Sequence, residues 1–244
     1  RKQTKLIFIE IGSSDLSEAI ILAKTNPYKK VITKIYESSS STYKNLLRIK
    51  DSFKLKNIEI FNKAIVPSKL NYRLEKNKKA NLNKMVYSQK TVKNKSKNML
   101  LSEIDGINKP EIHKLLKMDI EGLEEKLLIE NIEFIKNLSN ISFTIELHQS
   151  MYKNNLVLEK VFYELLENGY SILFIELSRE CNQYFLNHLK KTSKVFKKSG
   201  GRILIKYPPI YCIKYIANTD YRLIKNNPYF SKRNIRSITL TKIT

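Results

Sequence analysis

Short apolar runs alternate along the chain with stretches in which apolar residues recur every three or four positions. The runs are rich in β-branched residues and end in glycine or a polar residue, which is typical of buried strands. The stretches between them have the spacing of amphipathic helices. The pattern predicts strands over residues 5–12, 30–38, 57–66, 112–119, 140–148 and 170–176, and helices over 13–24, 39–53, 121–137 and 154–170.

Regular alternation of strands and helices with short connections predicts the fold class. We expect an α/β fold with a doubly wound, mostly parallel sheet and helices on both faces. Residues 67–98 interrupt the alternation as an irregular basic insert, with a small hairpin around 83–92 as one alternative. The predicted core therefore spans residues 1–180 and contains this insert. A basic C-terminal segment, 181–244, is expected to complete or extend the sheet with a helix over 182–198 and strands over 200–208 and 236–243, the last one antiparallel.

The formal net charge of +22 is concentrated in two segments. Residues 67–98 carry +9 and residues 181–244 carry +13, which accounts for all of it. A basic face can attract phosphates of nucleic acid, nucleotides or membranes. The alternative is a biased genome, which we favour, because Lys (37) far outnumbers Arg (8) and base-reading proteins rely on Arg. No apolar run is long enough to span a bilayer, and no signal-peptide pattern is present. Two cysteines are too few for a disulfide framework. We therefore expect a cytoplasmic protein.

The end of the first predicted strand carries candidate binding residues. Gly12 permits a tight turn there, and Glu10 is an acid near the end of an apolar strand, where it can accept hydrogen bonds from a cationic ligand group. Asp15 and Glu18 fit a helix N-cap and its partner. Glu37, 25 residues after Gly12, ends the second strand and can accept two ribose hydroxyls. A complete G-x-G-x-x-G is absent, so the pattern favours an adenosine-type ligand over a pyrophosphate.

Five segments between residues 6 and 148 follow one another in order: FIEIGSSD, VITKIYES, NIEIFNKAI, LLKMDIEGLEEKLL and ISFTIELH. Together they resemble the FkbM family of S-adenosylmethionine-dependent methyltransferases. The most specific is Asp-x-Glu-Gly-x-Glu, formed by Asp119, Glu121, Gly122 and Glu124. The first turn departs from the family's usual Asp-x-Gly-Ala-Asn-x-Gly, since Glu10 replaces the Asp and Ser13 and Ser14 replace Ala-Asn.

The resemblance implies a class I, Rossmann-like methyltransferase with S-adenosylmethionine as cofactor. It implies O-methylation of a hydroxyl on a sugar or another small molecule. Asp119, Glu121 and His148 are the candidate catalytic residues, with Asp119 or His148 as the base. The implied cofactor-binding residues are Glu10, Gly12, Ser13, Ser14, Asp15, Glu37, Ser38, Asn62 and Ala64. Gly12→Asp is then expected to abolish cofactor binding and leave the fold intact.

Other interpretations of the same residues stay open. Glu121 can cap the helix that follows, Glu124 and Glu125 can pair with lysines along it, and His148 can be a structural histidine. The acids can instead hold Mg²⁺, although we assign no metal. At the level of function, the basic segments suit an RNA methyltransferase, and the altered first turn suits a non-catalytic binding protein.

Overall fold

The computed structural model describes residues 6–25, 31–68, 72–75, 84–87, 98–148, 151–152, 155–177, 194–199, 202–206 and 235–243. A nine-stranded sheet dominates it, in the order β11-β12-β10-β13-β9-β8-β1-β2-β3. Its strands are β1 (Leu6–Ile11), β2 (Val31–Tyr36), β3 (Ile58–Phe61), β8 (His113–Met118), β9 (Ile141–Glu146), β10 (Ser171–Leu177), β11 (Lys194–Ser199), β12 (Arg202–Lys206) and β13 (Ile235–Lys242).

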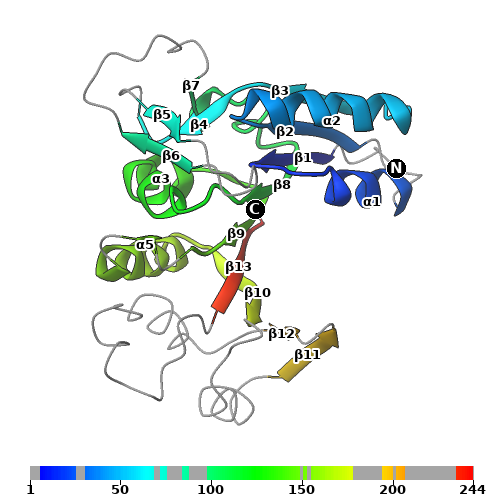
Figure 1. The fold of residues 1–244 in the computed structure, drawn as a ribbon. Helices are drawn as coiled ribbons and strands as arrows, with labels where there is room; N and C mark the ends of the chain where they lie inside the picture. Colours follow the sequence, from blue (N-terminus) through cyan, green and yellow to red (C-terminus); the bar gives the residue numbers. More distant parts are fainter. Residues whose placement is uncertain are drawn as a thin grey trace.

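Helices cover both faces of this sheet (Figure 1). They are α1 (Ser17–Thr25), α2 (Ser40–Ser52), α3 (Glu124–Glu130), α4 (Ile132–Lys136) and α5 (Asn155–Glu167). One buried cluster joins Leu16, Ala19 and Leu46 of the α1–α2 side to the sheet. A larger cluster joins α3, α4 and α5 to the opposite face. Burial of these apolar faces from both sides holds the sheet between two helical layers.

The predicted doubly wound, mostly parallel sheet is confirmed. β3, β2, β1, β8 and β9 pair in parallel. From β1, successive strands are added on one side as β2 and β3 and on the other side as β8 and β9, so the topological switch point lies between β1 and β8. β13 lies antiparallel between β9 and β10, as expected for a final strand. β11 and β12 extend the sheet beyond β10.

Some boundaries differ from the prediction. The expected strand over 57–66 divides into β3 and β4 (Ala64–Val66), and β4 pairs with β7 (Asn98–Leu100) in a separate sheet. The helix over 121–137 divides at Asn131. Within the expected helix over 182–198, the described residues from Lys194 onward form strand β11, and the rest lies outside the described residues.

The insert and the remaining short element have local structure of their own. β5 (Tyr72–Glu75) and β6 (Lys84–Tyr87) form an antiparallel pair inside the basic insert. A short 3-10 helix, Leu101–Glu103, leads back toward the main sheet. In the part of the chain that the structure describes, no helix is both long and apolar enough to cross a membrane.

Candidate functional site

A cavity of about 620 Å³ opens at the carboxyl ends of β1, β2, β8 and β9. Open α/β sheets bind ligands at this edge, at the point where the connections that follow two neighbouring parallel strands lead to opposite sides. Here that point lies between β1 and β8. The loops after these strands supply most of the lining, and Arg236 reaches it from β13. The cavity therefore occupies the position that the fold makes available for a ligand.

Gly12 closes the end of β1 against the end of β8. Its φ is +79°, a conformation that favours glycine, and its amide donates to the carbonyl of Tyr36 at 3.0 Å. The Asp119 amide donates to the carbonyl of Ile11 at 2.9 Å. A Cβ atom on Gly12 would overlap the carbonyl oxygen of Asp119. The expectation that Gly12→Asp leaves the fold intact is therefore wrong, since the added atoms collide with backbone.

Glu10 is a buried carboxylate with an unsatisfied oxygen. Its side chain is 1% exposed, and Oε1 lies 3.2 Å from the Lys117 Nζ. Oε2 has no hydrogen-bond partner among the described residues, and neither has the nearby hydroxyl of Ser13. Burial raises the pKa of Glu10 to about 7. The charge of Lys117 opposes this rise, and the charge of Glu18 adds to it. Buried polar atoms are rarely left unpaired, so these two mark a place for a ligand's polar group.

Glu37 links the first two loops at the cavity wall. Its carboxylate accepts hydrogen bonds from the amides of Ser13, at 3.4 Å, and Ser39, at 2.5 Å. Burial raises its pKa, and these two bonds oppose the rise. Each carboxylate oxygen has a second lone pair, so further hydroxyl donors can still be accepted. The side-chain Nδ2 of Asn62 donates to the backbone carbonyl of Glu37 at 2.9 Å, and Asn62 does not line the cavity.

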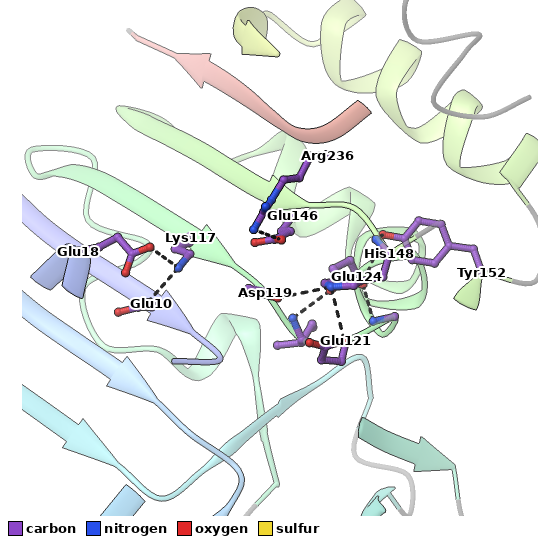
Figure 2. A network of polar contacts seen from close by, with 12 residues as sticks. Glu10, Glu18, Lys117, Asp119, Glu121, Glu124, Glu146, His148, Tyr152 and Arg236 are labelled. Atoms are coloured by element: carbon purple, nitrogen blue, oxygen red, sulfur yellow. Dashed lines mark hydrogen bonds and ion pairs between the residues drawn. The ribbon is translucent and has the colours of Figure 1, made fainter. Parts of the chain in front are cut away.

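Glu124 organises the acidic loop that follows β8. Its side chain is fully buried and accepts the amides of Ile120, at 2.9 Å, and Gly122, at 2.8 Å. These bonds hold a loop in which Glu121 and Gly122 both have positive φ. The alternative in which Glu124 pairs with a lysine along the helix is therefore wrong. Figure 2 shows its carboxylate beneath the loop, in contact with His148 and Tyr152.

The same carboxylate orients His148. Glu124 Oε1 lies 2.9 Å from His148 Nδ1, so a proton on Nδ1 is donated to Glu124. The other ring nitrogen, Nε2, lies 3.7 Å from Asp119 Oδ1 and 3.5 Å from Glu121 Oε2. The structure thus brings together Asp119, Glu121 and His148, the three residues that the sequence suggested for catalysis, at the cavity (Figure 2).

Charge crowding shifts the pKa values of this group upward. Burial alone would lower the pKa of His148, but the hydrogen bond and charge of Glu124, with Glu121 and Asp119, raise it above 6.5. Burial and the charge of Glu146 raise the pKa of Asp119 to about 7. Asp119 and His148, two groups whose pKa values are raised, therefore lie side by side, as acid–base chemistry requires.

The titration of His148 gives a prediction in the free protein. Its NMR midpoint should lie above 6.5, and Glu121→Gln should lower it, because one neighbouring negative charge is removed. The raised pKa contributes stability that is complete below pH 6.5 and is lost as pH rises through the folded-state value. His113, in β8, is the control resonance. A midpoint that stays in place in Glu121→Gln would contradict the assigned charge coupling.

Asp119, Glu146 and His148 place one possible ligand atom each within 4.8 Å of one another. A divalent cation could bridge atoms at this separation. However, Arg236 already contributes a positive charge, with its guanidinium 2.9 Å from Glu146 Oε1. Because Arg236 already pairs with Glu146, we assign no metal to this group.

Most of the predicted binding residues converge on the cavity. Its lining contains eight of the nine, the exception being Asn62: Glu10, Gly12, Ser13, Ser14, Asp15, Glu37, Ser38 and Ala64. Asp15 is not the N-cap that the sequence predicted, because α1 begins at Ser17. Its carboxylate instead accepts the backbone amide of Ser17 at 3.0 Å, just before the helix. Sequence reasoning missed Lys117, Glu18, Glu146 and Arg236. The position of Lys117 within the apolar run Leu115–Met118 could have indicated its role, whereas no local pattern indicated a role for Arg236.

Neither a family model nor a curated protein matches the sequence significantly. Several solved structures are similar at low identity. A precorrin-6y C5,15-methyltransferase from Geobacter metallireducens has 12% identity and a TM-score of 0.43, over 98% of this chain and 81% of that one. Methyltransferase FkbM from Methylobacillus flagellatus has 13% identity and a TM-score of 0.45, over 70% of this chain and only 39% of that one. An O-methyltransferase from a Brevibacillus brevis polyketide synthase, in complex with S-adenosyl-L-homocysteine, has 10% identity and a TM-score of 0.42, over 98% and 67%.

Proposed function

We propose that this chain is an S-adenosylmethionine-dependent O-methyltransferase of FkbM-like type, acting on a hydroxyl of a sugar or another small molecule. The observation that carries the proposal is the pairing of two half-sites in one cavity. One half holds buried acceptors at the ends of β1 and β2, and the other holds a histidine oriented by a buried carboxylate.

The first half-site fits the cofactor by the chemistry of its donors and acceptors. Glu10 offers its unpaired Oε2 to the α-ammonium group, and the Ser13 hydroxyl lies beside it. Glu37 would accept the ribose hydroxyls. Ala64, the first residue of β4, also lines the cavity and would contact the adenine ring.

The second half-site fits removal of a proton from a hydroxyl. S-adenosylmethionine held by Glu10, Ser13 and Glu37 would supply an electrophilic methyl group for transfer to the acceptor oxygen. His148 Nε2 takes the hydroxyl proton, and Glu124 stabilises the resulting imidazolium through Nδ1. Asp119 and Glu121 position the acceptor, and alignment of the acceptor oxygen supplies much of the rate enhancement.

Calorimetry with S-adenosylmethionine tests the cofactor assignment. Wild-type protein should bind it, and Glu37→Gln should weaken binding by about 10- to 100-fold, since a hydrogen bond to a charged group is worth about 1.5–3 kcal/mol. Glu59→Gln, a substitution on β3 outside the cavity, is the control and should bind like wild type. Equal affinity of Glu37→Gln and wild type would remove Glu37 from the site. Absence of binding to wild type would contradict the proposed function.

Label transfer identifies the acceptor. Labelled S-adenosylmethionine is incubated with a panel of glycans, small hydroxylated compounds and RNA, with and without EDTA. We expect label on a hydroxylated small molecule or glycan, at a rate that EDTA does not change. Label on RNA, with binding that falls steeply with salt, would instead favour a nucleic-acid methyltransferase. Cofactor binding without transfer to any acceptor would favour a binding protein.

A further inference from the structure

Lys117 is a charged residue near the carboxyl end of β8, between Leu116 and Met118. It pairs directly with Glu10 of β1 in the parallel register, so both side chains reach the cavity from neighbouring strands. Its side chain is 21% exposed, and its Nζ lies between two carboxylates, 3.2 Å from Glu10 and 2.7 Å from Glu18 (Figure 2). The two carboxylates thus balance the charge of a largely buried ammonium group.

The two carboxylates that contact Lys117 differ in their surroundings. Glu10 is 1% exposed and fixed within β1, whereas Glu18, in the first turn of α1, is 44% exposed. Burial alone would raise the pKa of Glu18, but its hydrogen bond to Lys117 and the charge of that ammonium lower it. The contact from Glu18 can therefore be exchanged at little structural cost, whereas the contact from Glu10 cannot.

Glu10 Oε2 provides the second, independent observation. This buried oxygen lines the cavity and has no hydrogen-bond partner among the described residues. The site therefore offers a free anionic acceptor next to an ammonium that holds a replaceable carboxylate. An α-amino acid carries the complementary groups, an ammonium and a carboxylate on one carbon.

We propose that Lys117 binds the α-carboxylate of a ligand's amino-acid end, while Glu10 binds its α-ammonium, and that Glu18 occupies the carboxylate position until the ligand replaces it. This inference rests on the proposed function, because S-adenosylmethionine is the ligand with such an end. The exchange keeps the charges of the buried groups balanced, since one carboxylate replaces another beside Lys117. The ligand's ammonium then pairs with Glu10, which has a spare acceptor.

The proposed site separates two nucleosides that share everything except the amino-acid end. S-adenosylhomocysteine carries the amino acid, and 5′-methylthioadenosine has the same adenosine and a thioether without it. Calorimetry with both ligands therefore isolates the contribution of Lys117 and Glu18 from that of the ribose and adenine contacts.

Two variants and a control complete the experiment. Lys117→Met should weaken S-adenosylhomocysteine by about 10- to 100-fold and change 5′-methylthioadenosine less than about twofold. Glu18→Ala removes a half-exposed carboxylate, keeps the buried pair, and should tighten S-adenosylhomocysteine about three- to tenfold without affecting 5′-methylthioadenosine. Lys136→Met is the matched control, because Lys136 also bridges two carboxylates and is 17% exposed, but lies outside the cavity.

The outcomes separate this inference from the proposed function. If Lys117→Met does not fold, Glu18→Ala alone decides. Unchanged or weaker S-adenosylhomocysteine binding by Glu18→Ala overturns the exchange, as does an equal loss of both ligands in a folded Lys117→Met protein. Wild-type protein that binds neither nucleoside contradicts the proposed function itself.

Discussion

Gly12→Ala should lower the free energy of unfolding by about 2 to 5 kcal/mol and abolish binding of S-adenosylmethionine. The left-handed conformation at φ +79° costs an alanine about 1–2 kcal/mol. Overlap of the new Cβ with the Asp119 carbonyl adds about 1–3 kcal/mol of overpacking. Because β1 and β8 must separate to relieve it, the loops on either side of the cavity move apart. Chemical denaturation and calorimetry measure the two effects.

Gly169→Ala provides the matched control for this variant. Gly169 has a similar φ of +85°, but a Cβ there meets only the end of Lys242, at 3.7 Å. It should therefore cost only the conformational strain of about 1–2 kcal/mol and leave ligand affinity unchanged. Equal destabilisation by the two substitutions would show that the collision with Asp119 contributes nothing.

His148→Asn should lower kcat by about 100- to 10,000-fold, the range that a general base contributes. Asparagine can place an amide N–H near the position of Nδ1 and so keep a donor for buried Glu124, whereas it has no equivalent of Nε2. Binding of S-adenosylhomocysteine should change little, because the ring lies at the acceptor end of the cavity. Single-turnover rates and calorimetry separate the two quantities.

His113→Asn is the control for the loss of a histidine. His113 begins β8, at the opposite end of the strand from Asp119, and is not in the cavity lining. It should retain wild-type kcat. If His148→Asn kept full kcat, the proton would have another acceptor, and Asp119, whose pKa is raised to about 7, would be the next residue to test.

The sequence predicted well those features that depend on neighbouring residues. Runs rich in apolar and β-branched residues located β1, β2, β8 and β9, because the central strands of a parallel sheet are largely buried. Strand ends then placed Gly12, Glu37 and Asp119 at one edge, since the carboxyl ends of parallel strands coincide. Ser39 was recognisable as the start of α2, where its hydroxyl accepts the amide of Thr42 at 3.4 Å.

Only the tertiary structure decided which polar groups face each other. Glu124 looked like a surface residue of a helix, yet it lies fully buried beneath the loop and orients His148, which is 24 positions away. The bridge from Lys117 to Glu10 spans 107 positions, and the contact of Arg236 with Glu146 spans 90. Local patterns report propensity and burial periodicity, whereas these pairs follow from strand register and sheet order. Register and order are set by packing of the whole core, so they emerge only when the chain is folded.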